Sequence, residues 1–400
     1  MKFKAAVILL LLTSYFTLSA QDISTSKFGN GILNIIDKDS TWSMKIGARM
    51  QFLGLATWEN TNGNLHTDQT NFLLRRSRLK FDGFAFTPKL TYKIELGLSN
   101  RDMSGASIYT SNTPRFVYDA VMKWNFHENF VLWFGQTKLP GNRERVISSG
   151  DMQFVDRSIL NANFNIDRDV GIQLRHHFNL SNSFVVREII AISQGEGRNV
   201  TTGNLGGFQY TGRVEVLPFG TFQSKGDYVG SSIERPEKSK LSVGLTYDFN
   251  NDAVKTRSNL GKYMLTSTGF HKTNITTLFI DAMYKCKGFS FMGEYAKRDA
   301  DKPIATEEDG TPTGDIVYVG QALNLQAGYL FANNWELSGR YSNVNPEENI
   351  TGTQPINQYT LGVSKYIVGH KLKVQTDISY TDIQQLNNSV TYRLQFDVHF

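Results

Sequence analysis

The 400-residue sequence has almost no cysteine, little proline and, after its N-terminal stretch, no long apolar run. The single cysteine, Cys286, cannot form an internal disulfide, and we interpret it as a packed thiol. No later stretch approaches the ~18 apolar residues that a membrane-spanning helix needs. Tandem repeats of solenoid length are also missing. These absences argue against a disulfide scaffold, a helical membrane protein and a repeat protein.

The charge of the chain is close to balanced. Lys2 and Lys4, an apolar run over 5–12 and a small residue at Ala20 predict a secretory signal peptide over 1–20. Its removal lowers the formal charge from +5 to about +3, which gives no signal for a nucleic-acid partner. An exported chain that is 12% aromatic and lacks helical periodicity is expected to be either a secreted all-β protein or an outer-membrane barrel.

The last stretch, 389–400, reads SVTYRLQFDVHF and alternates between apolar and polar side chains. A strand with this period has one apolar face and one charged, wet face. An aromatic row ending on Phe400 suits the lipid-facing wall of an outer-membrane barrel better than the core of a soluble sandwich. Such a strand also resembles the signal that barrel-assembly machinery recognises. We therefore expect that machinery and outer-membrane lipid as partners.

Earlier segments share the alternation, which makes about sixteen strands, an acceptable even number for a bacterial barrel. A barrel this wide is not filled by its own wall and leaves an aqueous channel. We predict an all-β fold, a 16-stranded antiparallel transmembrane β-barrel in the outer membrane of a Gram-negative bacterium. The predicted strands are 42–58, 70–86, 89–98, 115–126, 130–138, 169–178, 183–193, 208–217, 240–250, 274–286, 288–298, 317–331, 333–342, 357–368, 370–381 and 390–400.

The predicted connections alternate between short and long, as periplasmic turns and outer loops do. The connection 218–239 is the exception, because it falls on the periplasmic side but is too long for a tight turn. Either it is a genuine long turn, or the strand count is wrong by two there. Residues 21–40 lack clear alternation and predict a short periplasmic N-terminal segment, which leaves 41–400 for the barrel.

The longest outer connection, 139–168, follows the fifth predicted strand. Loops of this length are usually functional or disordered. Apolar residues such as Phe154, Leu160 and Phe164 would order this loop against a surface. Folding it into the lumen would bury them on the barrel wall and narrow the channel.

The same connection carries sequence blocks of a known family. Residues 135–159, GQTKLPGNRERVISSGDMQFVDRSI, hold a GQxK-P motif, an ER pair and an F-x-x-R-S element. They resemble the third-loop signature of the phosphate-selective porin O and P family. Further blocks that resemble this family are RRSRLKFDG (75–83), VYDAVMKW (117–124), QAGYLF (326–331) and GRYSNVNP (339–346).

The resemblance implies a 16-stranded barrel, often trimeric, in which the third outer loop folds into the lumen. It also implies that arginine and lysine side chains line the path of small anionic solutes such as phosphate. A homotrimer is therefore among the expected partners, and no cofactor is implied.

Cationic side chains at a narrow wet point favour anions, and the guanidinium fork can hold phosphate in a bidentate manner. Arg76, Arg78 and Lys80 share the parity that faces water, whereas Arg75 falls on the apolar parity and is expected at a bulge or above the lipid boundary. The alternative for each cation is a bracing role, paired with an acid across the lumen. The candidate pore and anion-binding residues are Arg143, Arg145, Arg157, Arg76, Arg78, Lys80, Arg49 and Lys138.

Two acids are expected to brace this region. Glu144 lies within the long loop, and Asp119 matches a recurring acid of the family and is interpreted as a lumenal partner for an arginine. No nucleophile elbow, phosphate-binding glycine loop or zinc motif is present, so we predict neither an enzyme nor a metal site.

The sequence therefore predicts an outer-membrane porin for passive diffusion of small hydrophilic solutes, biased to anions such as phosphate. A general non-selective porin is the nearest alternative. A secreted all-β binding protein and an outer-membrane barrel enzyme are further alternatives. Reversal potentials separate the porins from each other, and cell fractionation separates a barrel from a soluble export.

Overall fold

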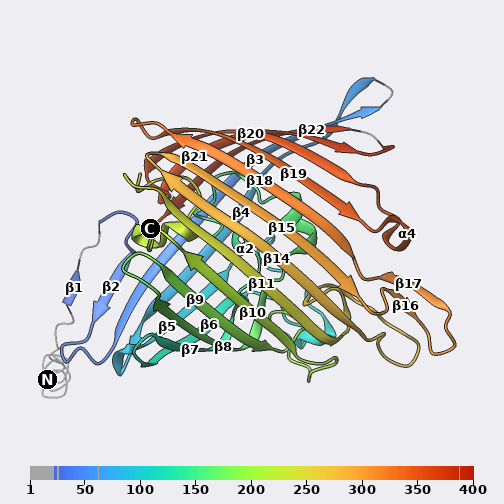
Figure 1. Cartoon of the computed structure of the whole chain (residues 1–400), viewed down its shortest axis with the longest axis horizontal. Coiled ribbons are helices and arrows are strands. Elements are labelled where there is room, and N and C mark those ends of the chain that lie inside the picture. Colours follow the sequence, from blue (N-terminus) through green and yellow to red (C-terminus); the bar gives the residue numbers. More distant parts are fainter. Residues whose placement is uncertain (1–21, 25–26, 62, 387) are drawn as a thin grey trace, which may run out of the picture.

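The computed structural model describes residues 22–24, 27–61, 63–386 and 388–400, so the predicted signal peptide lies outside the described residues. The described chain forms a closed antiparallel barrel (Figure 1). Closure occurs between the first barrel strand, β3 (Ser43–Thr61), and the last, β22 (Ser389–His399), where Phe52 lies opposite Phe396. The predicted barrel of sixteen antiparallel strands is confirmed.

The other barrel strands follow chain order, each paired with its neighbours in the sequence of strands. They are β4 (Asn64–Ala85), β5 (Thr87–Gly97), β6 (Val117–His127), β7 (Phe130–Lys138), β8 (Arg168–Asn179), β9 (Val185–Ser193), β10 (Gln209–Leu217), β11 (Lys240–Ala253), β14 (Thr273–Cys286), β15 (Phe289–Ala300), β18 (Gly320–Leu330), β19 (Trp335–Pro346), β20 (Ile356–Val368) and β21 (Leu372–Ile383).

The remaining elements are short. β1 (Asp22–Ser24) pairs with β2 (Leu33–Ile36), and β2 pairs with the start of β3, so the segment predicted to be periplasmic extends the sheet. Two hairpins, β12 (Lys255–Arg257) with β13 (Leu260–Tyr263) and β16 (Ile304–Thr306) with β17 (Pro312–Ile316), lie within the long connections. The helical turns are η1 (Ile108–Thr110), α2 (Arg143–Val146), α3 (Ile159–Phe164), η2 (Gln223–Tyr228) and α4 (Glu348–Thr351). No helix in the described part of the chain is both long and apolar enough to cross a bilayer.

The barrel wall is apolar outside and polar inside. On β11, Leu245 and Tyr247 are 51% and 54% exposed, whereas Thr246 and Asp248, which alternate with them, are fully buried. This is the reverse of a soluble protein, because the exposed face carries the apolar side chains that suit a lipid environment. The strand alternation thus places every second residue of the wall toward the barrel interior.

Two connections fold into that interior. Residues 139–167, here called the inward loop, join β7 to β8 and contain α2 and α3. Residues 218–239, here called the inward segment, join β10 to β11 and contain η2. The inward segment is therefore a genuine long connection, and the predicted strand count needs no change.

Candidate pore constriction

The inward loop packs on one side of the barrel interior. Leu160 and Phe164 of α3 are fully buried and belong to one apolar cluster with Phe279 of β14. Ser158 caps α3, since its hydroxyl accepts a hydrogen bond from the backbone N–H of Asn161 (3.2 Å). The wall opposite α3 carries small or apolar residues at inward positions: Ala191, Ala296, Ala322 and Val344. The loop therefore covers the β9 to β19 side of the interior.

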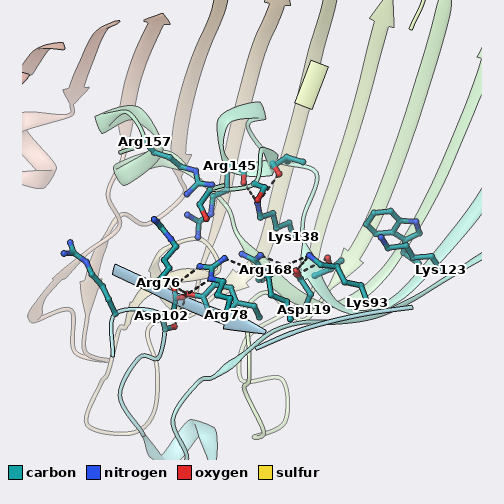
Figure 2. A pocket seen from close by; sticks show the side chains of 18 of the residues that line it. Arg76, Arg78, Lys93, Asp102, Asp119, Lys123, Lys138, Arg145, Arg157 and Arg168 are labelled. Carbon is teal, nitrogen blue, oxygen red and sulfur yellow. Dashed lines mark hydrogen bonds and ion pairs between the residues drawn. The ribbon is translucent and has the colours of Figure 1, made fainter. Parts of the chain in front are cut away.

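A cavity of about 350 Å³ remains between the inward loop and the wall formed by β4 to β8. Figure 2 shows Arg145 and Arg157 reaching into it from the loop, and Arg76, Arg78 and Lys93 from the strands on the other side. Eleven cationic side chains and three acidic ones line it. The cations are Arg75, Arg76, Arg78, Lys93, Arg101, Lys123, Lys138, Arg145, Arg157, Arg168 and Arg175, and the acids are Glu95, Asp102 and Asp119.

A β-bulge brings two consecutive arginines to this cavity. Gln51 of β3 lies opposite Arg76, but Phe52 lies opposite Leu74, so Arg75 is the extra residue of β4. Arg75 is 6% exposed and forms an ion pair with Asp156 of the inward loop. Arg76 donates a hydrogen bond to the side-chain oxygen of Gln51, and no acid in the described chain forms an ion pair with it. The bulge predicted as one of two placements for Arg75 is thus present.

Arg78 is neutralised by two acids. Its Nε and Nη2 atoms donate to the carboxylate of Asp102 at 2.8 and 2.7 Å, and its Nη1 donates to Glu95 at 2.8 Å. The ring of Tyr118 lies 4.1 Å from the guanidinium carbon. Arg78 therefore shapes the cavity as part of a fixed network more than as a free charge.

Asp119 is the centre of a second network. Its carboxylate accepts hydrogen bonds from Arg168 Nε (2.9 Å), Lys93 Nζ (2.6 Å) and the Thr137 hydroxyl (3.2 Å). Arg168 immediately follows the inward loop, so this network joins the loop end to β5, β6 and β7. The geometry agrees with the bracing role that the family resemblance implies for Asp119.

The cations on the loop side are less compensated. Arg157 donates to the backbone oxygens of Glu144 (3.0 Å) and Ile147 (2.9 Å), and no acid in the described chain forms an ion pair with it. Burial and the nearby Arg145 lower the pKa of the Arg157 guanidinium to about 9. Arg145 does form an ion pair, with Asp167. An anion beside Arg157 would relieve this uncompensated positive potential.

A further group of cations lies nearer the short-turn end of the same wall. Lys123 Nζ and the guanidinium carbon of Arg175 lie 4.1 and 3.8 Å from the ring centre of Trp133. Neither cation forms an ion pair with an acid of the described residues; both lie over the indole ring, and Arg175 also donates to the side-chain oxygen of Gln173 (2.8 and 3.3 Å). The basic lining thus extends from the loop contact toward the short turns.

The family description "Phosphate-selective porin O and P" matches residues 45–398, which is nearly the whole barrel. The chain belongs to this family. An uncharacterized protein of Aquifex aeolicus is 24% identical over 364 residues, which cover 84% of this porin and 82% of the relative. The family and the barrel identify an outer-membrane porin for passive diffusion, and both point to a channel rather than an enzyme.

Solved structures share the porin fold at low identity. OmpT of Vibrio cholerae has a TM-score of 0.55 with 12% identity, over 91% of this chain and 99% of that one. An anion-selective porin from Comamonas acidovorans has a TM-score of 0.53 with 12% identity, over 90% of this chain and all of that one. The outer membrane channel DcaP of Acinetobacter baumannii has a TM-score of 0.52, also with 12% identity, over 90% of this chain and 99% of that one. These similarities concern the fold.

The porin places most predicted basic residues at the cavity, but Arg143 is an exception. Its guanidinium is fully buried, donates to Asp281 at 2.7 Å and pairs with Glu215 at 3.4 Å. Although burial opposes the charge, these two acids raise the pKa of Arg143 above its ordinary value. Arg143 does not line the cavity, so the predicted anion-binding role does not fit its position, and we assign it to bracing.

Arg49 and Lys80 also lie outside the set that lines the cavity. Arg49 is 2% exposed and donates to Asp397 (2.9 and 2.8 Å) and to the Ser149 hydroxyl (2.7 Å). It therefore braces the inward loop against the barrel seam, and the predicted anion contact does not fit this position. Lys80 is partly buried on β4 beside the cavity wall. Arg76, Arg78, Lys138, Arg145 and Arg157 line the cavity.

Glu144 of α2 connects two parts of the inward loop. Its carboxylate accepts hydrogen bonds from the backbone N–H of Ser158 at 3.0 and 3.2 Å, as well as from the Ser158 hydroxyl. This contact ties α2 to the start of α3 across the inward loop.

Among the described residues, no group of three or more His, Cys, Asp or Glu side chains has metal-site geometry.

Sequence reasoning missed several residues that line the cavity. Lys93, Lys123 and Arg175 all lie on the polar parity of their strands, so applying the alternation to every strand would have found them. Arg75 was expected at a bulge or above the lipid boundary, and its contact with the cavity was missed because the bulge shifts the alternation by one residue. Trp133 gave no signal, since an inward tryptophan is indistinguishable in sequence from an interfacial one.

Proposed function

We propose that this porin favours small anions, with phosphate among them, at the cavity between the inward loop and the β4 to β8 wall. The observation that carries the proposal is the lining of eleven cations against three acids, contributed from two opposed elements. Fixed positive charge in a narrow wet passage lowers the entry cost for anions and raises it for cations. Guanidinium groups can also hold a phosphate oxygen pair in a bidentate manner.

Arg76 and Arg157 are the residues we assign to anion contact. Both line the cavity, and neither forms an ion pair with an acid of the described chain. Arg145 and Lys138 contribute charge at the loop, whereas Arg78 and Arg168 hold the acids of the wall in fixed networks.

The experiment is a reversal-potential measurement in planar bilayers across a potassium chloride gradient, with and without added phosphate. We expect an anion-selective reversal potential and a reduction of chloride current by phosphate. The double variant Arg76→Gln with Arg157→Gln should lower the anion-to-cation permeability ratio several-fold, because two uncompensated charges are removed. Lys262→Gln, an outer-loop variant at a residue whose side chain is 70% exposed, is the matched control and should leave the ratio unchanged.

A general non-selective porin is the alternative. The networks around Glu95 and Asp119 favour this alternative, because these acids neutralise part of the positive charge of the wall. A cation-selective or neutral reversal potential in the wild-type protein would contradict the anion proposal and leave the channel assignment intact. Chloride current that is unaffected by phosphate would contradict the phosphate part alone.

We further propose that residues 1–20 are removed as a signal peptide and that residues 21–40 lie in the periplasm. We also propose that barrel-assembly machinery inserts the chain into the outer membrane and that the porin forms a homotrimer. A trimer form is described for OmpT of Vibrio cholerae, which supports the last point at the level of the fold. The mass of the native protein in detergent tests the oligomer: a mass of three chains is expected, and a single-chain mass would contradict it.

A further inference from the structure

The inward segment, 218–239, enters the barrel from the end where the short turns lie. Figure 1 shows its yellow-green ribbon within the outline of the barrel, beside the mark of the C-terminus. The anion pathway proposed above makes no use of this segment. A connection of this length at the end of the short turns is unexpected for a porin barrel and requires a function or a docking surface.

The inward segment packs on an apolar part of the barrel wall. Phe222 is 6% exposed and packs in one cluster with Leu217 of β10, Met283 of β14 and Met292 of β15, and Tyr228 packs against the same cluster. Inward positions of a barrel wall are polar where they face water, so buried leucine and methionine there indicate a surface that is kept covered. The same cluster includes Ile147 and Met152 of the inward loop.

Polar contacts hold the segment to the wall as well. Lys285 Nζ of β14 donates to the backbone oxygen of Val229 at 2.7 Å. The Tyr228 hydroxyl donates to Glu215 of β10, and Asp227 forms an ion pair with Arg187 of β9. These bonds satisfy buried wall charges that would otherwise face an open lumen.

The inward segment also meets the inward loop. The backbone N–H of Gly230 donates to the backbone oxygen of Asp151 at 2.6 Å, and Arg143 Nη1 of the loop donates to the backbone oxygen of Asp227 at 3.0 Å. The two insertions, which enter from opposite ends of the barrel, are therefore joined inside it.

The wall covered by the two insertions differs in charge from the cavity. The buried inward residues of β10, β11, β14, β15 and β19 include five acids and four cations, against eleven cations and three acids at the cavity. Opening this half would add a path with a small net negative charge beside the basic one. The acids are Glu215, Asp248, Asp281, Glu294 and Glu336, and the cations are Arg213, Lys285, Arg298 and Arg340.

We propose that the inward segment is a second selectivity element, which together with the inward loop seals the mixed-charge half of the lumen and confines small anions to the basic cavity. The part that the segment itself covers lies around Glu215 and Lys285, whereas the loop covers Glu294, Arg298 and Arg340. This inference rests on the proposed anion function and extends it, because it assigns both the size limit and the sign of selectivity partly to residues 218–239. Phe222 and Gly230 are the positioning residues, the first against the wall and the second against the inward loop.

The first test replaces residues 221–235 of the full chain with a three-residue Gly-Ser-Gly link. We expect single-channel conductance to rise by about two-fold or more, because an unfilled sixteen-stranded barrel is an open aqueous channel. The anion-to-cation permeability ratio should fall, and liposome swelling should admit neutral oligosaccharides that the wild-type porin excludes. Wild-type conductance and sugar exclusion in this variant would overturn the proposal.

A matched pair of point variants keeps the test valid if the replacement prevents folding. A Cβ atom on Gly230 would lie 2.5 Å from the backbone nitrogen of Gln153, so Gly230→Ala must push the segment away from the loop. A Cβ atom on Gly226 would meet its nearest neighbour, Phe222 Cβ, at 3.4 Å, which is ordinary contact. Gly230→Ala should change conductance and selectivity in the direction of the replacement variant, and Gly226→Ala should change neither.

These measurements separate the two proposals. Conductance and sugar exclusion report the seal whatever the sign of ion selectivity. A wild-type porin without anion preference, combined with a wider pore in the variants, would contradict the anion function and support the seal. Equal conductance and equal sugar exclusion in Gly230→Ala and Gly226→Ala would overturn the seal, whatever the reversal potential.

Discussion

The ammonium group of Lys138 donates a hydrogen bond of 2.8 Å to the backbone oxygen of Arg145. The same group donates to the backbone oxygens of Val146 (3.0 Å) and Ile147 (3.1 Å), so the last residue of β7 holds the end of α2. Lys138 was a predicted anion contact, and its three bonds indicate that it orders the loop that carries Arg145.

Lys138→Met should therefore loosen the inward loop. We expect greater open-channel current noise and a lower anion-to-cation permeability ratio, because three backbone oxygens lose their donor. Single-channel recording measures both quantities. Lys123→Met is the control, since Lys123 has no bond to the loop. In this variant the anion-to-cation permeability ratio should fall without added current noise. Equal noise in the Lys138 and Lys123 variants would contradict the conclusion that Lys138 orders the loop.

Arg143 gives a prediction about stability. Arg143→Met removes one of the two arginines that pair with both of the buried acids Asp281 and Glu215, while Arg213 stays paired with them. The lost charged hydrogen bonds should cost roughly 1.5–3 kcal/mol of folding free energy. The midpoint of heat modifiability on gels should fall accordingly. Adding Asp281→Asn to Arg143→Met should recover part of the loss, and an unchanged midpoint in the single variant would show that Arg143 is not a brace.

Trp133 should matter through the two cations on its ring. Trp133→Leu removes the cation–π contacts of Lys123 (4.1 Å) and Arg175 (3.8 Å), each worth about 0.5–2 kcal/mol. We expect a smaller anion conductance with little change in the heat-modifiability midpoint, and Trp133→Phe should retain most of the conductance. Equal conductance in the leucine and wild-type proteins would contradict this role.

The turn residue His370 predicts a dependence of stability on pH. Burial, with Lys373 at 3.2 Å from its Nδ1, lowers the pKa of His370 from 6.5 to about 3, while the nearby Asp151 acts in the opposite direction. The folded protein thus keeps the imidazole neutral, with Nε2 hydrogen-bonded to the backbone oxygen of Gly230 (3.2 Å). The unfolded chain takes up a proton near pH 6.5, so stability is fully present above that pH and falls as the pH decreases toward 3.

The heat-modifiability midpoint between pH 7 and pH 4 tests this dependence. The wild-type midpoint should decrease on acidification more steeply than that of His370→Gln, which lacks the titrating group. Parallel slopes for the two proteins would assign the acid sensitivity to other residues, such as the buried carboxylates.

The strands were predictable because each obeys one local rule. The alternation on 389–400, for example, places Phe396 outward and Asp397 inward, and the structure keeps this pattern along β22. Lipid outside and water inside impose this rule on the wall residues that face lipid or water, so locating the strands needed no knowledge of distant contacts.

The constriction was only partly predictable, because it depends on contacts between distant segments. Arg143 and Arg145 are two residues apart in α2, yet one is sealed against β11 and β14 and the other lines the cavity. The orientation of a four-residue helix is set by what it packs on, which the sequence does not reveal. Buried Met283 and Met292 did carry a signal for the inward segment, since apolar residues at inward positions indicate a covered wall.

The seam between β3 and β22 has a consequence for biogenesis. Arg49 of β3 donates hydrogen bonds to Asp397 of β22 across the seam, and it also donates to Ser149 of the inward loop. Arg49 and Asp397 lie on the first and last barrel strands of the chain, so they come into contact only when β3 and β22 pair and close the barrel. A barrel intermediate in which β3 and β22 are still unpaired therefore lacks the Asp397 contact that fixes Arg49, one of the side chains that hold the inward loop to the wall.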